Sequence, residues 1–105
     1  MFRILYFPNF EKELKKIFSK RELIYFENYI DKNIIFYGNK IGKVLTYNYL
    51  REIKIGIKRV YYLVYNDINT ILFVAVSKNK KDQQQIIDFI RENIDVYRSF
   101  IQNFY

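Results

Sequence analysis

The chain has 105 residues, half of them hydrophobic and a fifth aromatic, so it is long enough to bury one core and too apolar to be disordered. We therefore expect a single domain over residues 1–105. Eighteen Lys and Arg against 11 Asp and Glu give a formal charge of +7, which favours acidic partners such as nucleic acid. The chain has no cysteine or histidine, which excludes disulfides, thiol nucleophiles, His-based acid–base pairs and the usual zinc sites.

An apolar run at residues 2–7, ended by Pro8, predicts a first strand. The run contains a single basic residue and is too short for a signal peptide or a membrane span. We therefore expect a cytoplasmic protein that has no membrane partner.

Two amphipathic helices are predicted next. Apolar residues recur at helical spacing from Asn9 to about Phe18, and Asn9 stands where it would cap this helix. Ser19 and Glu22 form a capping-box pattern, which predicts that a second helix begins there. The two helices would form a hairpin. The outer face of the first helix is basic and carries Lys12, Lys15 and Lys16.

The second half of the chain is predicted to form a sheet and a long helix. Segment 34–49 contains glycines and is typical of a loop or a short irregular strand. Residues 49–55, 58–65 and 70–77 are rich in β-branched and aromatic side chains and are separated by turn sequences, which predicts an antiparallel meander. Apolar residues then recur at three- and four-residue steps, which is typical of one continuous helix over 83–104.

Such a helix would be about 30 Å long, whereas a typical strand spans about 20 Å. Its last turns carry Phe100, Ile101, Phe104 and Tyr105, and they would overhang the sheet. Exposed apolar surface of this kind usually marks a contact with another chain, such as a second copy of the protein. Alternatively, this end of the helix folds back over the helical hairpin.

Three strand motifs carry a resemblance to a known family. They read LREIKI at residues 50–55, KRVYYLVY at 58–65 and ILFVAVSK at 71–78. With the order of elements, they make the sequence similar to the RelE/ParE toxin superfamily up to about residue 93. The resemblance implies an α+β fold of order β-α-α-β-β-β-α. In that fold an antiparallel sheet is flanked by an N-terminal helical hairpin and a long C-terminal helix.

The resemblance also implies a function. Ribosome-dependent members of this superfamily present basic residues on a concave sheet face to mRNA, and they cleave it without a metal or cofactor by attack of a ribose 2′-OH on the adjacent phosphate. The chain is thus expected to be the toxin of a type II toxin–antitoxin system and a metal-independent endoribonuclease, or mRNA interferase. Its expected partners are mRNA, the ribosome and a cognate antitoxin, with the C-terminal helix as a contact for the antitoxin or for a homodimer.

The expected catalytic residues lie on two strands. Arg59 stands where the resemblance implies a phosphate-stabilising arginine, and a guanidinium can hold two phosphate oxygens. Glu52 and Lys54 are two positions apart, so they share one face of the sheet. Glu52 is a candidate base for the 2′-OH, and Lys54 a candidate phosphate contact. Arg51 has the opposite parity and is expected to point away.

Further RNA contacts are expected from a basic loop carrying Lys78, Lys80 and Lys81, from the three lysines of the first helix, and from Tyr61, whose ring could stack on a base. The sequence departs from the family pattern just after this loop. The family carries a Tyr or His there as general acid, whereas this chain has glutamines at 83–85. This departure favours a ParE-like toxin that does not cut RNA, or a binding module that has lost catalysis.

Each of these residues also has a simpler explanation. An arginine on a strand, such as Arg59, is more often a surface charge or a salt-bridge partner than a catalytic group. In the simpler explanation, Glu52 and Lys54 pair with each other or across strands. The lysines form solvated surfaces, and Tyr61 packs in the core. Without the resemblance, the chain would be interpreted as a small basic nucleic-acid-binding protein.

Overall fold

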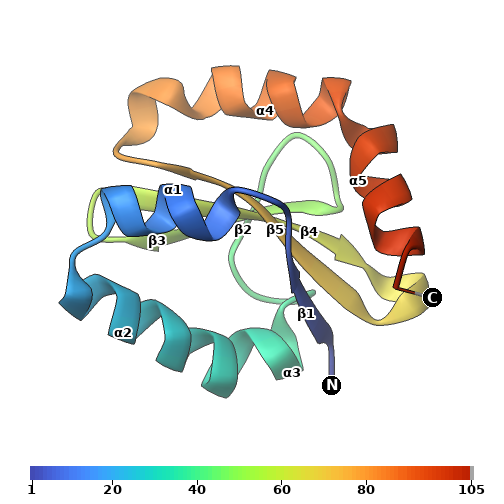
Figure 1. Cartoon of the computed structure of the whole chain (residues 1–105), viewed down its shortest axis with the longest axis horizontal. Helices are drawn as coiled ribbons and strands as arrows, with labels where there is room; N and C mark the ends of the chain where they lie inside the picture. The colour runs from blue at the N-terminus through green and yellow to red at the C-terminus, as the bar shows by residue number, and fades with distance from the viewer. Residues whose placement is uncertain (105) are drawn as a thin grey trace.

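The computed structural model describes residues 1–104 and contains one mixed five-stranded sheet (Figure 1). Its strand order is β1-β5-β4-β3-β2, and the strands are β1 (Arg3–Tyr6), β2 (Lys43–Val44), β3 (Leu50–Ile55), β4 (Lys58–Tyr65) and β5 (Thr70–Ser77). The antiparallel meander β3-β4-β5 is confirmed. However, β1 pairs in parallel with β5, so the sheet is not wholly antiparallel as expected. A parallel neighbour is possible because a long connection, which contains the helical hairpin and strands β2 to β4, separates β1 from β5.

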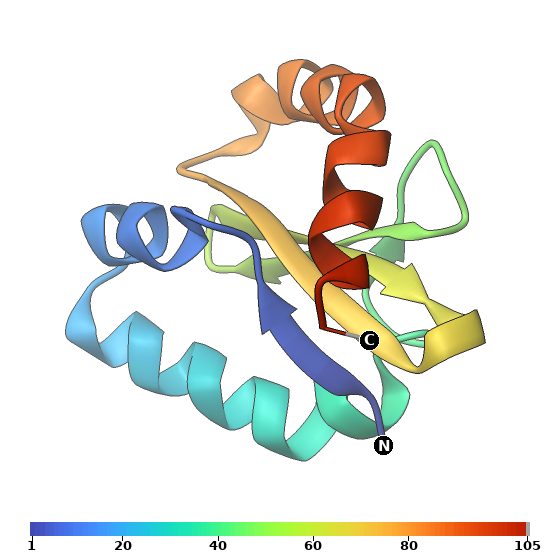
Figure 2. The same cartoon turned by 45° about the vertical axis from the view of Figure 1, so that its right-hand side comes forward.

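Helices cover both faces of the sheet (Figure 2). The elements on one face are α1 (Phe10–Ile17), α2 (Lys20–Tyr29), a π-helical turn (Ile30–Ile34) and α3 (Ile35–Tyr37), and those on the other are α4 (Gln83–Glu92) and α5 (Ile94–Gln102). Short 3₁₀ turns occupy Asn66–Ile68 and Lys80–Asp82. No helix within residues 1–104 is both long and apolar enough to cross a bilayer.

The two predicted helix caps have different outcomes. The capping box at α2 is confirmed, since Ser19 and Glu22 exchange backbone-to-side-chain hydrogen bonds of 2.8 and 3.2 Å. The cap predicted at α1 is wrong. Asn9 precedes the helix, but its backbone is left-handed (φ 73°) and its side chain makes no capping hydrogen bond. A capping side chain normally requires an extended backbone at that position.

Strand β4 lies in the middle of the sheet and divides its side chains between two cores. Val60, Tyr62 and Val64 face α1 and α2, whereas Tyr61 and Leu63 face α4 and α5. This alternation follows from the two-residue repeat of a strand. Arg59 has the parity of Tyr61, so it lies on the face that α4 and α5 cover.

The predicted continuous C-terminal helix is broken at Asn93 (φ −111°, ψ 16°), where α4 ends and α5 begins. Its side-chain amide donates to the Phe89 carbonyl (2.8 Å), which is how asparagine competes with helical hydrogen bonding. Figures 1 and 2 show α5 turned away from the axis of α4. The apolar spacing survives the break, so periodicity alone could not reveal it.

Because of this turn, α5 neither overhangs the sheet nor covers the helical hairpin, and both predictions are wrong. Ile101 is fully buried in the core between the sheet and α4–α5. Phe100 packs edge-on against Phe7, at 5.2 Å between ring centroids. Phe104 remains partly exposed beneath the Arg3 guanidinium, and Tyr105 lies outside the described residues.

Candidate functional site

The register of three strands brings the candidate residues into one row. Lys54 on β3 lies opposite Arg59 on β4, and Arg59 lies opposite Ser77 on β5. Glu52 lies opposite Tyr61 on the same face, one pleat away. Arg51 is on the other face, where its guanidinium donates to the carbonyls of residues 39 and 41 at 2.8 and 2.9 Å.

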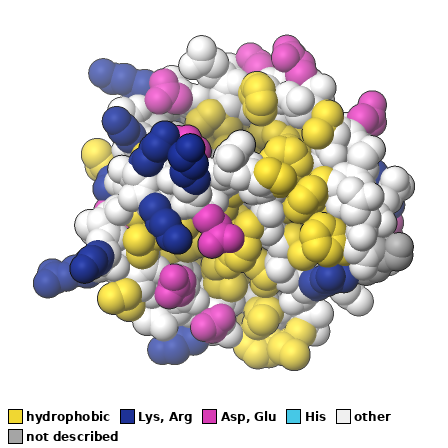
Figure 3. Space-filling model, in the orientation of Figure 1, with side chains coloured by type: hydrophobic (Ala, Val, Ile, Leu, Met, Phe, Trp, Pro, Cys, Tyr) yellow, Lys and Arg dark blue, Asp and Glu magenta, His cyan; other side chains and the backbone are white. Residues whose placement is uncertain are grey.

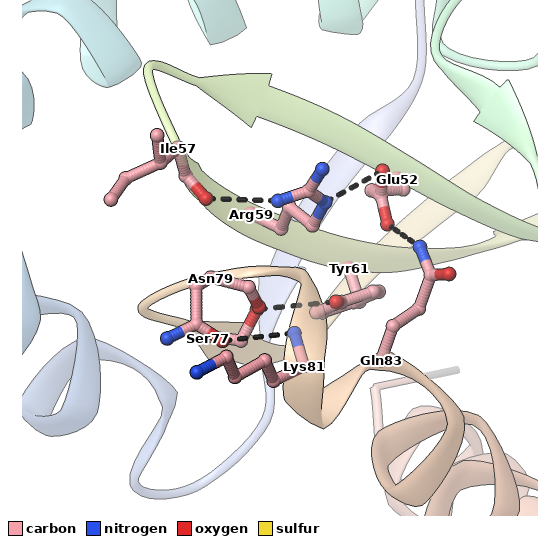
Figure 4. Close-up of polar contacts among 8 residues, drawn as sticks. All are labelled: Glu52, Ile57, Arg59, Tyr61, Ser77, Asn79, Lys81 and Gln83. Carbon is pink, nitrogen blue, oxygen red and sulfur yellow. Dashed lines mark hydrogen bonds and ion pairs between the residues drawn. The ribbon is translucent and has the colours of Figure 1, made fainter.

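Arg59 and Glu52 form an enclosed ion pair (Figure 4). The Arg59 Nε lies 3.3 Å from the Glu52 Oε1, and Arg59 and Glu52 are only 8% and 2% exposed. The approach does not have hydrogen-bond geometry, so the contact is a charge attraction. Arg59 Nη1 also donates to the Ile57 carbonyl (2.9 Å), and the side-chain amide of Gln83 donates to the other oxygen of Glu52.

This enclosure limits what the pair can do chemically. The charge of Arg59 is balanced by Glu52. Its Nη2 has neither a hydrogen bond nor an ion-pair contact within residues 1–104, and it points toward neither partner in Figure 4. Glu52 is covered, so no ribose hydroxyl can reach it in this conformation. Glu52 becomes available to a substrate only if its contacts with Arg59 and Gln83 open.

Gln83 thus has a definite contact at the position where the resemblance implies a general acid. Its amide holds Glu52 from a helix 31 residues along the chain. This contact holds the ion pair closed. An amide cannot supply a proton as an acid does, so Gln83 is not a general acid for the leaving group. Sequence reasoning had identified Gln83 as a departure and had not found this contact.

Tyr61 is fully buried, so the expectation that it stacks on a base is wrong. Its place on the central strand beneath α4 turns its ring into the core. Its hydroxyl shares a 3.2 Å hydrogen bond with Ser77, which in turn donates to the Asn79 carbonyl (3.0 Å) (Figure 4). Burial raises the pKa of the Tyr61 hydroxyl, which therefore stays protonated. The role of Tyr61 is to anchor the start of the basic loop.

The lysines remain in solvent. Those of the row and the loop (Lys54, Lys78, Lys80 and Lys81) are exposed, and so are those of α1 (Lys12, Lys15 and Lys16). Lys16 pairs with Glu13 at 3.5 Å; none of the other six makes an ion pair within residues 1–104. Figure 3 shows cationic side chains gathered on one side of the molecule, beside a band of hydrophobic ones. No group of three or more acidic side chains in the described part of the chain could hold a metal.

No protein-family model matches the sequence, and no curated protein does. Solved structures do match. The toxin–antitoxin complex RelBE2 from Mycobacterium tuberculosis is 15% identical with a TM-score of 0.62, covering 72% of this chain and 95% of that chain. The isolated RelE toxin of E. coli is 14% identical with a TM-score of 0.61, covering 86% and 99%.

An archaeal RelE–RelB complex from Pyrococcus horikoshii OT3 is 16% identical with a TM-score of 0.53, covering 76% of this chain and 97% of that chain. These three structures span bacteria and an archaeon, and each is matched over nearly its whole length. The chain therefore has the fold of the RelE toxins, as its strand motifs implied.

Proposed function

We propose that the protein is the toxin of a type II toxin–antitoxin pair and that it cleaves mRNA on the ribosome. One observation carries this proposal. The chain contains essentially the whole RelE fold, and that fold aligns Lys54, Arg59 and the start of the loop 78–81 in one row across three strands. A row of cations beside an arginine suits the phosphate of an RNA backbone.

Cleavage in this proposal begins with opening of the enclosed pair. The RNA first meets the exposed Lys54 and the loop lysines. The competition of its phosphate for Arg59 then draws the guanidinium away from Glu52, starting at the unbonded Nη2. Once the Gln83 amide has also moved away, Glu52 takes the 2′-OH proton while the 2′ oxygen bonds to phosphorus. The bond from phosphorus to the 5′ oxygen breaks, and a loop lysine supplies that oxygen with a proton.

The test is induced expression in a bacterial host, followed by mapping of mRNA 5′ ends. Wild type should arrest growth and create new ends inside translated codons. Arg59→Ala should abolish both effects. Because this substitution also leaves Glu52 buried and unpaired, Arg59→Lys is the second variant: it keeps a cation for Glu52 and loses the two-point grip on phosphate. Folded Arg59→Lys that still creates the new ends would contradict the role of Arg59.

The partners proposed here are a cognate antitoxin, mRNA and the ribosome, in the cytoplasm. RelE structures from both M. tuberculosis and P. horikoshii were determined with an antitoxin or RelB bound, which supports an antitoxin for this chain. A contact of the antitoxin or of a second copy with α5 stays a prediction.

A second candidate is a toxin or binding module of the same fold that does not cut RNA. The specific observation in its favour is the Glu52–Arg59 pair, held closed by Gln83 where a general acid would be expected. Growth arrest without new mRNA ends would favour this candidate over the nuclease. Unimpaired growth with salt-dependent RNA affinity would favour a small basic nucleic-acid-binding protein.

A further inference from the structure

A groove lies between α2 and the free edge of β3, outside the row of candidate catalytic residues. It consists of two adjoining depressions of about 310 and 390 Å³ that share Tyr25. Strand β2 is only two residues long and pairs with residues 51 and 52, so the rest of β3 has no strand beside it there. The groove thus runs along an open sheet edge.

One wall of the groove is a ridge of α2. Arg21, Tyr25 and Tyr29 recur every four residues, so their side chains line up on one helix face. The rings of Tyr25 and Tyr29 are nearly parallel, with an interplanar angle of 20° and 6.2 Å between centroids. Tyr25 is 55% exposed, which leaves a large part of its ring in solvent between the two depressions.

The charges that line the groove are positive. Arg21, Lys43 and Lys54 are exposed and make no ion pair or side-chain hydrogen bond within residues 1–104. The two acidic residues of the lining are already engaged. Glu22 is bound to Lys58 at 2.6 Å, and Glu52 is buried against Arg59. Arg21 therefore lies beside the exposed ring of Tyr25 on α2. Lys43 and Lys54 border the groove at the β2–β3 edge and, by strand parity, direct their side chains to the face that carries Glu52 and Arg59.

We propose that this groove binds single-stranded RNA, with a base stacked on Tyr25 and phosphates against Arg21, Lys43 and Lys54. Aromatic rings beside a cationic track are how proteins hold single strands without reading their sequence. An acidic peptide fits less well, because the aliphatic residues of the lining, Ile53 and Ile55, are themselves buried and the exposed apolar surface of the groove is the flat ring of Tyr25. The proposal rests on the proposed function: Lys54 belongs to the row and borders the groove at the sheet edge, so a strand that leaves Tyr25 and crosses this edge would reach the row.

The test uses the whole protein and a fluorescein-labelled oligouridylate of about 12 nucleotides, with affinity measured by fluorescence anisotropy. Tyr25→Ala should weaken binding about tenfold, the loss of one stacked base. Tyr25→Phe should bind within about twofold of wild type, because it keeps the ring. Tyr37→Ala is the matched control: Tyr37 is 54% exposed but lies on α3, outside the groove lining, and its loss should leave affinity unchanged.

Two further measurements separate stacking from charge. Tyr25→Ala should leave the affinity for inorganic polyphosphate unchanged, because that polyanion has no bases. Arg21→Ala should lower the slope of log affinity against log salt by about 0.7, the value for one phosphate contact on a single strand. Equal RNA affinities for Tyr25→Ala and Tyr37→Ala would overturn the proposal. So would a Tyr25-dependent affinity for oligoglutamate without one for RNA, since the groove would then be a protein site.

Failure of this proposal is distinguishable from failure of the proposed function. If wild type cleaves mRNA in cells and Tyr25→Ala binds RNA normally, the nuclease stands and the groove is not an RNA site. If no mRNA is cleaved while RNA binding depends on Tyr25, the groove stands and the nuclease does not.

Discussion

Two regions of the molecule combine arginine, carboxylate and tyrosine, yet one is closed and charge-balanced whereas the other is open to solvent. In the enclosed pair, Arg59 is balanced by Glu52, and the neighbouring Tyr61 lies in the core. In the groove, Arg21 has no acidic partner among the described residues, and Tyr25 is in solvent. The residue types are nearly the same in both places. Pairing and burial therefore decide which charges an RNA strand can meet first.

The largest expected difference between the two regions is in the stability of tyrosine variants. Tyr61→Ala should lower the free energy of unfolding by about 3–5 kcal/mol, because it leaves a cavity in the core. Tyr25→Ala should change it by less than about 0.5 kcal/mol, as for an exposed position. Urea denaturation measures both. Similar losses of stability for the two variants would contradict the burial of Tyr61 and the exposure of Tyr25.

The enclosed ion pair is the next test of the comparison. Arg59→Met should lower the free energy of unfolding by about 3 kcal/mol, because Glu52 is then buried without its counter-charge. The double variant Arg59→Met with Glu52→Met should recover much of that loss, since neither charge remains. The exposed Lys54→Met is the control and should stay within about 0.5 kcal/mol of wild type. Strictly additive losses in the double variant would rule out the pair.

A smaller effect is expected at the start of α4. Gln83→Ala should destabilise the fold by about 1–2 kcal/mol, because it removes a hydrogen bond to a buried carboxylate. Gln84→Ala is the matched control: its amide donates to the exposed Asp88 side chain one turn along the same helix, and its loss should be nearly neutral. Chemical denaturation of the two variants side by side compares them. Equal behaviour would show that Gln83 does not hold the ion pair closed.

The smallest expected effect depends on pH and concerns the groove. A hydrogen bond from Lys58 holds the pKa of the Glu22 carboxyl below its usual value. A lowered pKa in the folded state stabilises the fold above the unfolded pKa of about 4.3, and this contribution is lost as pH falls through the folded pKa. The melting temperature of Glu22→Gln should lie slightly below that of wild type at neutral pH, and the gap should close in acid. A gap independent of pH would contradict the pairing.

Features with local causes could be predicted from the sequence. The meander β3-β4-β5 follows from strand propensity and turns, and the α2 cap follows from Ser19 and Glu22 three residues apart. The break at Asn93 could not be predicted, because one interruption leaves the apolar spacing intact. The failed cap at Asn9 reflects a backbone conformation that the residue type does not determine.

The site was predictable only as a set of residues. Strand parity puts Glu52 and Lys54 on one face, but pairing of Glu52 with Arg59 depends on the β3–β4 register and on Gln83 from a distant helix. The groove depends on tertiary structure even more. Its tyrosines come from α2, and its lysines come from β2 and β3, so no short stretch of sequence contains the pattern.

The most direct test of the account is a titration of ¹⁵N-labelled protein with oligouridylate, followed by NMR. Gly42 and Gly56 line the two depressions of the groove, whereas Gly38 is buried elsewhere, and the Arg59 Nε–H reports on the enclosed pair. The amide signals of Gly42 and Gly56 should shift first, the Arg59 Nε–H signal should follow only at higher RNA concentration as the pair opens, and the Gly38 signal should stay in place. If the Arg59 signal shifted first and the two groove glycines did not, RNA would enter at the enclosed pair, and the account would be contradicted.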